Sequence, residues 1–130
     1  MTKKELSQLY WINREIEQDK ERLAELEAAA RGVTSKISGL PHVSGIADKT
    51  AIAAEIADTK AIIKAKIDIS VVAYNRLNRY IASVDDSLIR QILSLRYIDG
   101  LPWQGVADEI GGGNTEDSVR MAHNRYLRMH

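Results

Sequence analysis

The chain has 130 residues, carries 18 Lys and Arg against 18 Asp and Glu, and contains no Cys and no Phe. This length suits one compact domain or one small domain plus an extended element. The lack of Cys excludes a disulfide scaffold, a thiolate zinc site and a cysteine nucleophile. The apolar runs are far shorter than the roughly 20 residues of a membrane span, and the charged sequence that follows residues 1–4 predicts no signal peptide. We therefore expect a soluble, cytoplasmic, mainly helical protein with no membrane partner.

The charge is unevenly distributed along the chain. Residues 1–31 carry six basic and seven acidic side chains, residues 32–84 carry seven and four, and residues 85–130 carry five and seven. The zero net charge therefore combines a basic middle with an acidic C-terminal third. Because nucleic-acid binding normally needs a basic surface, this distribution bears on any function predicted for that third.

The first predicted element is a long helix over residues 2–31, which contain no Gly or Pro and are rich in helix-forming residues. Thr2, with Glu5 three residues later, predicts a capping box, and Gly32 fits the helix stop. A 3-4 repeat in which only Asp19 is polar predicts a coiled-coil seam. The members of this seam are Leu9, Ile12, Ile16, Asp19, Leu23, Leu26 and Ala30.

A loop is predicted at about residues 32–48, and a second long helix from Asp48, as its N-cap, to about Ala82. Residues 1–82 thus predict a long antiparallel helical hairpin, a coiled coil. The 3-4 seam of the second helix comprises Ala53, Ile56, Lys60, Ile63, Ile67, Ser70, Tyr74, Leu77 and Ile81. A solvated face is predicted for the basic residues Lys60, Lys64, Lys66, Arg76 and Arg79.

Further apolar residues of the second helix lie outside its seam. They are Ile52, Ile62, Ile69, Val71 and Val72. A helix that is apolar on more than one side needs more than one partner. We therefore expect a homodimer or larger homo-oligomer, or a partner protein, while a plain structural spacer remains the alternative.

The C-terminal third, residues 83–130, predicts a helix-turn-helix domain. Ser83, with Asp86 three residues later, predicts a helix cap, and the following helix over residues 88–97 ends at Asp99-Gly100. A short helix over residues 102–111, a glycine turn and a last helix from about Thr115 to Arg128 follow.

Ala107 and Gly111 have the spacing of a helix-turn-helix, in which a small residue lets the second helix pass and a glycine permits the turn. The apolar positions of the last helix predict which of its side chains face the core. They are Val119, Ala122, Tyr126 and Leu127.

Several strings resemble known families. Residues 92–103 (Ile-Leu-Ser-Leu-Arg-Tyr-Ile-Asp-Gly-Leu-Pro-Trp) resemble the first half of sigma-70 region 4, and residues 110–111 and 118–120 continue the match. The layout of the whole chain is similar to small sigma-like or RinA/ArpU-type transcriptional regulators of phages and prophages of Gram-positive bacteria. The strings that carry this similarity are residues 9–16, 39–42, 75–81 and 110–120.

The chain departs from the sigma pattern at two points. Counted from Ala107, the valine of the recognition helix is expected at position 117, whereas here it is Val119, so the turn is two residues longer. The last third is also net negative, with Asp108 and Glu109 on the first helix of the motif. Base-contacting positions are therefore not transferred from the family.

Candidate DNA-contacting residues follow instead from the geometry of the motif, which places the start of the second helix against base edges. They are Asn114, Thr115, Ser118, Arg120, Met121, Asn124, Arg125 and Arg128. Arg120 is the candidate for a guanine edge. No catalytic residue, cofactor or metal site is predicted, because no nucleophile context, phosphate loop or metal-ligand spacing is present.

The resemblance implies a phage-derived regulator of a bacterial host cell that binds promoter double-stranded DNA, in some cases together with the host RNA polymerase. Two alternatives remain open. One is a small terminase subunit, which recognises phage DNA for packaging and assembles as a ring. The other is a protein that binds polymerase without contacting DNA.

Overall fold

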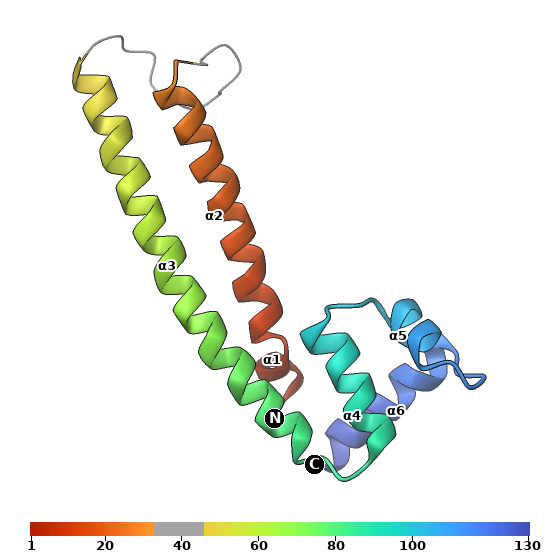
Figure 1. Cartoon of the computed structure of the whole chain (residues 1–130). Coiled ribbons are helices and arrows are strands. Elements are labelled where there is room, and N and C mark those ends of the chain that lie inside the picture. The colour runs from red at the N-terminus through yellow and green to blue at the C-terminus, as the bar shows by residue number, and fades with distance from the viewer. Residues whose placement is uncertain (33–45) are drawn as a thin grey trace. The chain divides into compact units, whose positions relative to one another are not determined.

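The computed structural model describes residues 1–32 and 46–130, and all regular structure in these ranges is helical (Figure 1). The elements are α1 (Lys3–Leu6), α2 (Gln8–Ala30), α3 (Ile46–Ala82), α4 (Ser87–Leu93), the π-helix η1 (Ser94–Ile98), α5 (Trp103–Ile110) and α6 (Glu116–Met129). The predicted all-α class is confirmed. Most of the loop predicted at 32–48 lies outside the described residues. Within the described ranges no helix is long and apolar enough to cross a bilayer.

The chain forms two compact units. Unit 1 contains residues 1–12 and 70–130, and unit 2 contains residues 13–69. The boundary predicted between residues 82 and 83 therefore lies inside unit 1. Unit 1 as a whole carries nine basic and eight acidic side chains, because residues 1–12 and 70–84 add four basic residues and one acid to the acidic C-terminal third.

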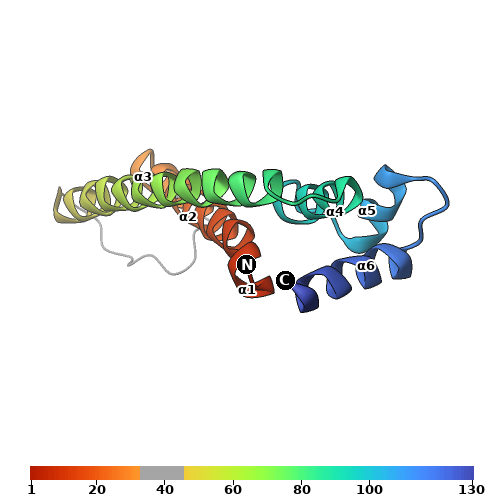
Figure 2. The same cartoon turned by 90° about the horizontal axis from the view of Figure 1, so that it is seen from below.

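Unit 2 consists of antiparallel segments of α2 and α3, which lie side by side (Figures 1 and 2). Ile16, Leu26 and Ile63 are buried in this unit. Asp19, the polar residue of the predicted α2 seam, accepts a hydrogen bond of 2.6 Å from the Lys66 ammonium. This hydrogen bond raises the pKa of Lys66. Lys66 therefore does not belong to the predicted solvated face.

The seam of α3 differs from its predicted register at every second position. Ile56, Ile63, Ser70 and Leu77 lie on the buried side as predicted, but the intervening positions shift by one residue. Ala53, Lys60, Ile67 and Tyr74 are exposed, whereas Ile52, Thr59, Lys66 and Ala73 are half-buried. A 3-4 and a 4-3 spacing share every second position, so the pattern of apolar residues alone does not distinguish the two registers of α3. The ion pair between Lys66 and Asp19 identifies the register that forms.

Two helix boundaries also differ from prediction. The helix predicted over residues 2–31 is interrupted at Ser7, whose hydroxyl donates at 2.8 Å to the carbonyl oxygen of Lys3, the oxygen that also accepts from the Ser7 amide at 3.0 Å. The second long helix begins at Ile46, so Asp48 lies within its first turn and is not the N-cap. The predicted ends at Gly32, with φ of 82°, and at Ala82 are confirmed.

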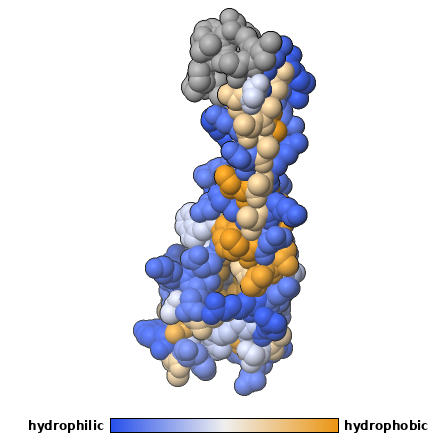
Figure 3. Space-filling model, turned by 90° about the vertical axis from the view of Figure 1, so that its left-hand side faces the viewer, coloured by the Kyte–Doolittle hydropathy of each residue, from blue (hydrophilic) through white to orange (hydrophobic). Residues whose placement is uncertain are grey.

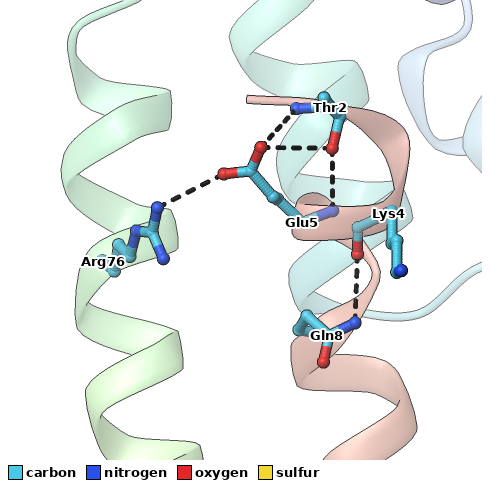
Figure 4. Close-up of polar contacts among 5 residues, drawn as sticks. All are labelled: Thr2, Lys4, Glu5, Gln8 and Arg76. Carbon is cyan, nitrogen blue, oxygen red and sulfur yellow. Dashed lines mark hydrogen bonds and ion pairs between the residues drawn. The ribbon is translucent and has the colours of Figure 1, made fainter.

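The predicted capping box at the start of the chain is confirmed (Figure 4). The Glu5 amide donates to the Thr2 hydroxyl at 3.2 Å, and the Glu5 carboxylate accepts from the Thr2 amide at 3.4 Å. The carboxylate also accepts from the Thr2 hydroxyl at 3.2 Å, and the hydrogen bonds that it accepts from the Thr2 amide and hydroxyl lower the pKa of Glu5. The same carboxylate pairs with Arg76 of α3 at 3.3 Å, which ties α1 to α3 within unit 1.

The core of unit 1 joins the two ends of the chain. Leu6 and Leu9 from the N-terminus pack with Leu77 and Ile81 of α3 and with the C-terminal helices. The remaining buried members are Val84, Ile89, Ile92, Leu93, Tyr97, Val106, Ala107 and Val119. The C-terminal helices therefore fold against residues 1–12 and 70–84 as one core.

The helix predicted over residues 88–97 has a different start and a different inner geometry. Asp86, and not Ser83, is the N-cap, since its carboxylate accepts from the amides of Leu88 and Ile89 at 2.8 and 3.3 Å. Ser83 donates its hydroxyl to Tyr80 at the end of α3. The helix then widens into η1 and ends, as predicted, at Gly100, which has φ of 71°.

Candidate nucleic-acid interface

The turn between α5 and α6 follows its predicted position. Gly111, Gly112 and Gly113 have φ of 65°, 63° and 80°, values that residues with a Cβ rarely adopt. Thr115 then caps α6, because its hydroxyl accepts from the Ser118 amide at 3.1 Å while the Ser118 hydroxyl accepts from the Thr115 amide at 2.9 Å. The turn over residues 111–115 therefore ends in a capping box at the start of α6.

The inner side of α6 packs into unit 1 as the sequence predicts. Val119 is buried, and Ala122, Tyr126 and Leu127 lie against the core. Ala107 on α5 is 2% exposed, consistent with the close approach of α6 that its small side chain allows. The opposite side of α6 is left to solvent.

His123 also lies on the inner side of α6 and is completely buried. Its Nε2 lies 2.5 Å from the Tyr97 hydroxyl, and its Nδ1 lies 2.9 Å from the Asn124 side-chain oxygen. Burial lowers the pKa of His123 and raises the pKa of Tyr97 to about 12. The arrangement therefore fits a neutral imidazole that accepts from Tyr97 and donates to Asn124.

Three of the eight predicted DNA contacts serve the turn itself. Asn114 donates to the carbonyl oxygen of Gly111 at 2.9 Å and accepts from the Ser118 hydroxyl at 3.2 Å. Thr115 and Ser118 form the capping box. Their polar atoms therefore stabilise the start of α6 and have reduced capacity for base edges.

Arg120 is bound by neighbouring acids. Its guanidinium lies 2.5 Å from the Asp117 carboxylate and 3.6 Å from that of Glu116. These ion pairs are exposed and individually weak, but they place two negative charges beside the arginine at the start of the helix. Arg120 therefore presents less positive charge than the sequence position alone suggests.

The other four predicted residues form the outward side of α6. Met121 is 59% exposed, and Arg125 and Arg128 are also exposed. Neither arginine forms an ion pair within the described residues. Asn124 is half-buried, with its oxygen directed at His123, so its two N–H groups remain as donors. We call Met121, Asn124, Arg125 and Arg128 the outward face of α6.

Sequence reasoning missed a cleft of about 650 Å³ in unit 1. We call it the basic cleft, and it is lined by Lys3, Lys4, Ser7, Gln8, Tyr10, Trp11, Arg96, Tyr97, Gly100, Trp103 and Arg120. Trp103 is half-buried against the core and also lines this cleft. The basic and aromatic residues close together at positions 3–11 are the one sequence signal for the cleft.

No family model, no curated protein and no solved structure matches this chain.

Proposed function

We propose that unit 1 binds double-stranded DNA through the outward face of α6, as a small phage-type transcriptional regulator of the sigma-70 region 4-like class that acts on promoters in a bacterial cytoplasm. The observation that carries this proposal is the pair Arg125 and Arg128, exposed and without an ion pair in the described chain, on a helix that follows a tight glycine turn. A host RNA polymerase is the second partner in this proposal, since a single copy has few cations with which to hold a site.

The chemistry of the outward face supports major-groove reading. An arginine can donate two hydrogen bonds to a guanine edge, an amide can donate to an acceptor on a base edge, and an apolar side chain can contact the thymine methyl group. Arg125, Asn124 and Met121 supply these groups, and Arg128 lies one turn later for a phosphate. Glu116 and Asp117 at the start of α6 oppose a close phosphate approach, so we expect moderate affinity.

Replacing Arg125 and Arg128 by Gln is expected to lower affinity for the cognate duplex by about tenfold or more. The loss follows because a base-contacting arginine contributes about 1–3 kcal/mol and a phosphate contact about one unit of salt slope. The measurement is fluorescence anisotropy on tiled intergenic fragments of the source genome, at two salt concentrations.

Two matched variants test the location of the interface. Arg14→Gln removes an exposed arginine of unit 2 and should leave affinity unchanged. Asp117→Asn removes one acid beside Arg120 and should raise affinity. Unchanged affinity in the Arg125 and Arg128 variant, with a native circular dichroism spectrum, would contradict the proposed docking.

A homodimer through α3 forms part of the proposal, because two copies would double the few DNA contacts of one. Figure 3 shows hydrophobic residues along an exposed side of α3. Within unit 2 these follow a second, exposed 3-4 repeat, the pattern of a helix that packs against another helix. Its members are Ala51, Ala54, Asp58, Ala61 and Ala65, of which only Asp58 is polar; Ile62 lies beside them, and Ile69 follows four residues after Ala65. The small alanines permit close approach of an identical α3.

Replacing Ile62 and Ile69 by Asp is therefore expected to convert a dimer into monomers. These residues are 49% and 55% exposed, so the fold of one chain tolerates the change. Ile63 is unsuitable for this test, since it is 8% exposed and its replacement would unfold unit 2. Light scattering measures the mass, and Ala53→Asp, at an exposed alanine on another side of α3, is the control.

The mass also separates the alternatives. An unaltered mass in the double variant would exclude this surface as the dimer contact. Assembly of a large ring on a packaging-site fragment would indicate a small terminase subunit and not a transcriptional regulator. Absence of binding to any fragment would favour a protein that binds polymerase without DNA, tested next by pull-down with purified host polymerase.

A further inference from the structure

The basic cleft of unit 1 combines four cations with exposed aromatic rings, and none of the described residues that line it is acidic. Its volume of about 650 Å³ lies within the range of about 300–1,000 Å³ that small-molecule sites occupy. Only Arg120 belongs also to the predicted DNA contacts. The cleft is therefore a surface whose chemistry the proposed function leaves largely unused.

The cations of the cleft differ in how far they are already engaged. Arg96 lies over the Trp103 ring at 4.5 Å and donates to the carbonyl oxygen of Leu101 at 3.0 Å. Arg120 is held by its two acidic neighbours. Lys3 and Lys4 are exposed and form no ion pair within the described residues. Their ammonium groups are thus the ones available to an anion.

A positive potential at the cleft is supported by its effect on a neighbour. Burial is the main cause that lowers the pKa of His123, and the positive charges of Lys3 and Arg96 lower it further. Both cations therefore act on His123, which does not line the cleft itself but contacts two of its lining residues, Tyr97 and Trp103. An anionic ligand bound in the cleft would gain attraction from more than one residue.

The aromatic residues of the cleft provide stacking faces. Tyr10 and Trp11 are 42% and 57% exposed, with ring centroids 5.0 Å apart and planes at 83°. Gly100 lies beside Tyr10, where an added Cβ would approach the ring to 3.9 Å. Exposed aromatic rings beside cations are the combination with which proteins stack a base and hold its phosphate.

We propose that the basic cleft binds a nucleoside phosphate, with its base stacked on Trp11 or Tyr10 and its phosphate at Lys3 and Lys4. Gln8 donates its side-chain N–H to the carbonyl oxygen of Lys4 at 3.3 Å, which leaves its side-chain oxygen to accept from the ligand. The nucleoside phosphate can be a free mononucleotide or one nucleotide of an unpaired strand. This inference does not depend on duplex binding by α6.

The protein carries a direct optical reporter for this test. Its two tryptophans, Trp11 and Trp103, both line the cleft. Titration of the full chain with dAMP, with a thymidine 12-mer, with adenosine and with inorganic phosphate is followed by tryptophan fluorescence. We expect saturable quenching by dAMP or by the 12-mer, and at least about tenfold weaker binding of adenosine, which lacks the charge-assisted hydrogen bonds.

Variants assign the binding to the cleft. Replacing Lys3 and Lys4 by Gln should weaken binding about tenfold or more, and these exposed positions leave the core intact. Trp11→Ala should weaken it about fivefold or more, the effect of losing one stacked base, read through Trp103. Lys64→Gln, an exposed lysine of unit 2, should change nothing.

The outcomes separate the two sources of the ligand. Saturation by dAMP indicates a free nucleotide, and saturation by the 12-mer alone indicates an unpaired strand. Quenching by neither, equal binding of adenosine and dAMP, or unchanged affinity in the Lys3 and Lys4 variant would each overturn the proposal. Loss of duplex binding by that variant without any mononucleotide or 12-mer binding would also overturn it, since the lysines would then serve the duplex backbone.

Discussion

Truncation of Ile92 to alanine is expected to lower the free energy of unfolding by about 2–5 kcal/mol. Ile92 lies on α4, is 0% exposed, and belongs to the core that joins residues 1–12, 70–84 and the C-terminal helices. Its removal leaves a cavity that rigid neighbours fill only partly. Urea unfolding followed by circular dichroism at 222 nm measures the change.

Leu88→Ala on the same helix provides the control. Leu88 is 37% exposed and lies outside the buried core, so the same loss of apolar side chain should cost well under half as much. Equal losses for both variants would mean that α4 does not pack as described. A loss below 1 kcal/mol at Ile92 would contradict its burial.

Protonation of His123 is expected to destabilise the protein in mildly acidic solution. Burial lowers the folded-state pKa of His123 below the unfolded value of about 6.5. The unfolded chain therefore binds more protons between these two values. The stabilising contribution of neutral His123 is fully present above about pH 6.5 and is lost as the pH falls toward the folded-state pKa, by up to about 1.4 kcal/mol per pH unit.

Comparison of His123→Gln with His130→Gln isolates this group. The first variant removes the titrating imidazole and should flatten the pH dependence of the unfolding free energy between pH 6.5 and 5. The second replaces an exposed histidine at the chain end and should keep the slope. Urea titrations at each pH provide the values, and a slope that persists in His123→Gln would exclude His123 as its source.

The C-terminal helices were the part of the fold most accessible from sequence. Gly111 to Gly113 and Thr115 determine the turn and the cap locally, so the start of α6 and its inner residues follow from short-range chemistry. The N-cap at Asp86 was misplaced by three residues because Ser83 is an equally good capping residue by type. Only the hydrogen bond that the Ser83 hydroxyl donates to the carbonyl oxygen of Tyr80 distinguishes Ser83 from an N-cap.

The seam register and the basic cleft depend on tertiary packing and could not be predicted in the same way. Two registers of α3 share half their positions, and the choice depends on Asp19 of another helix. The cleft combines Lys3 and Trp11 with Arg96 and Trp103, which are distant in sequence. The net negative charge of residues 85–130 likewise does not describe the unit that contains α6, because unit 1 also includes the more basic residues 1–12 and 70–84.

The Asp19–Lys66 pair gives unit 2 selectivity for a single alignment of its helices. An apolar repeat permits sliding by one heptad with little loss, since one aliphatic residue replaces another. Lys66 also pairs with Glu15 of α2 at 3.5 Å. Such a slide of α2 would place Ile12 or Leu26 at the position of Asp19 and Gln8 or Arg22 at that of Glu15, so the Lys66 ammonium would lose both carboxylates. A polar pair within an apolar seam thus penalises shifted pairings, at the expense of some stability. The same penalty would discriminate against foreign coiled coils that lack an acid at that position.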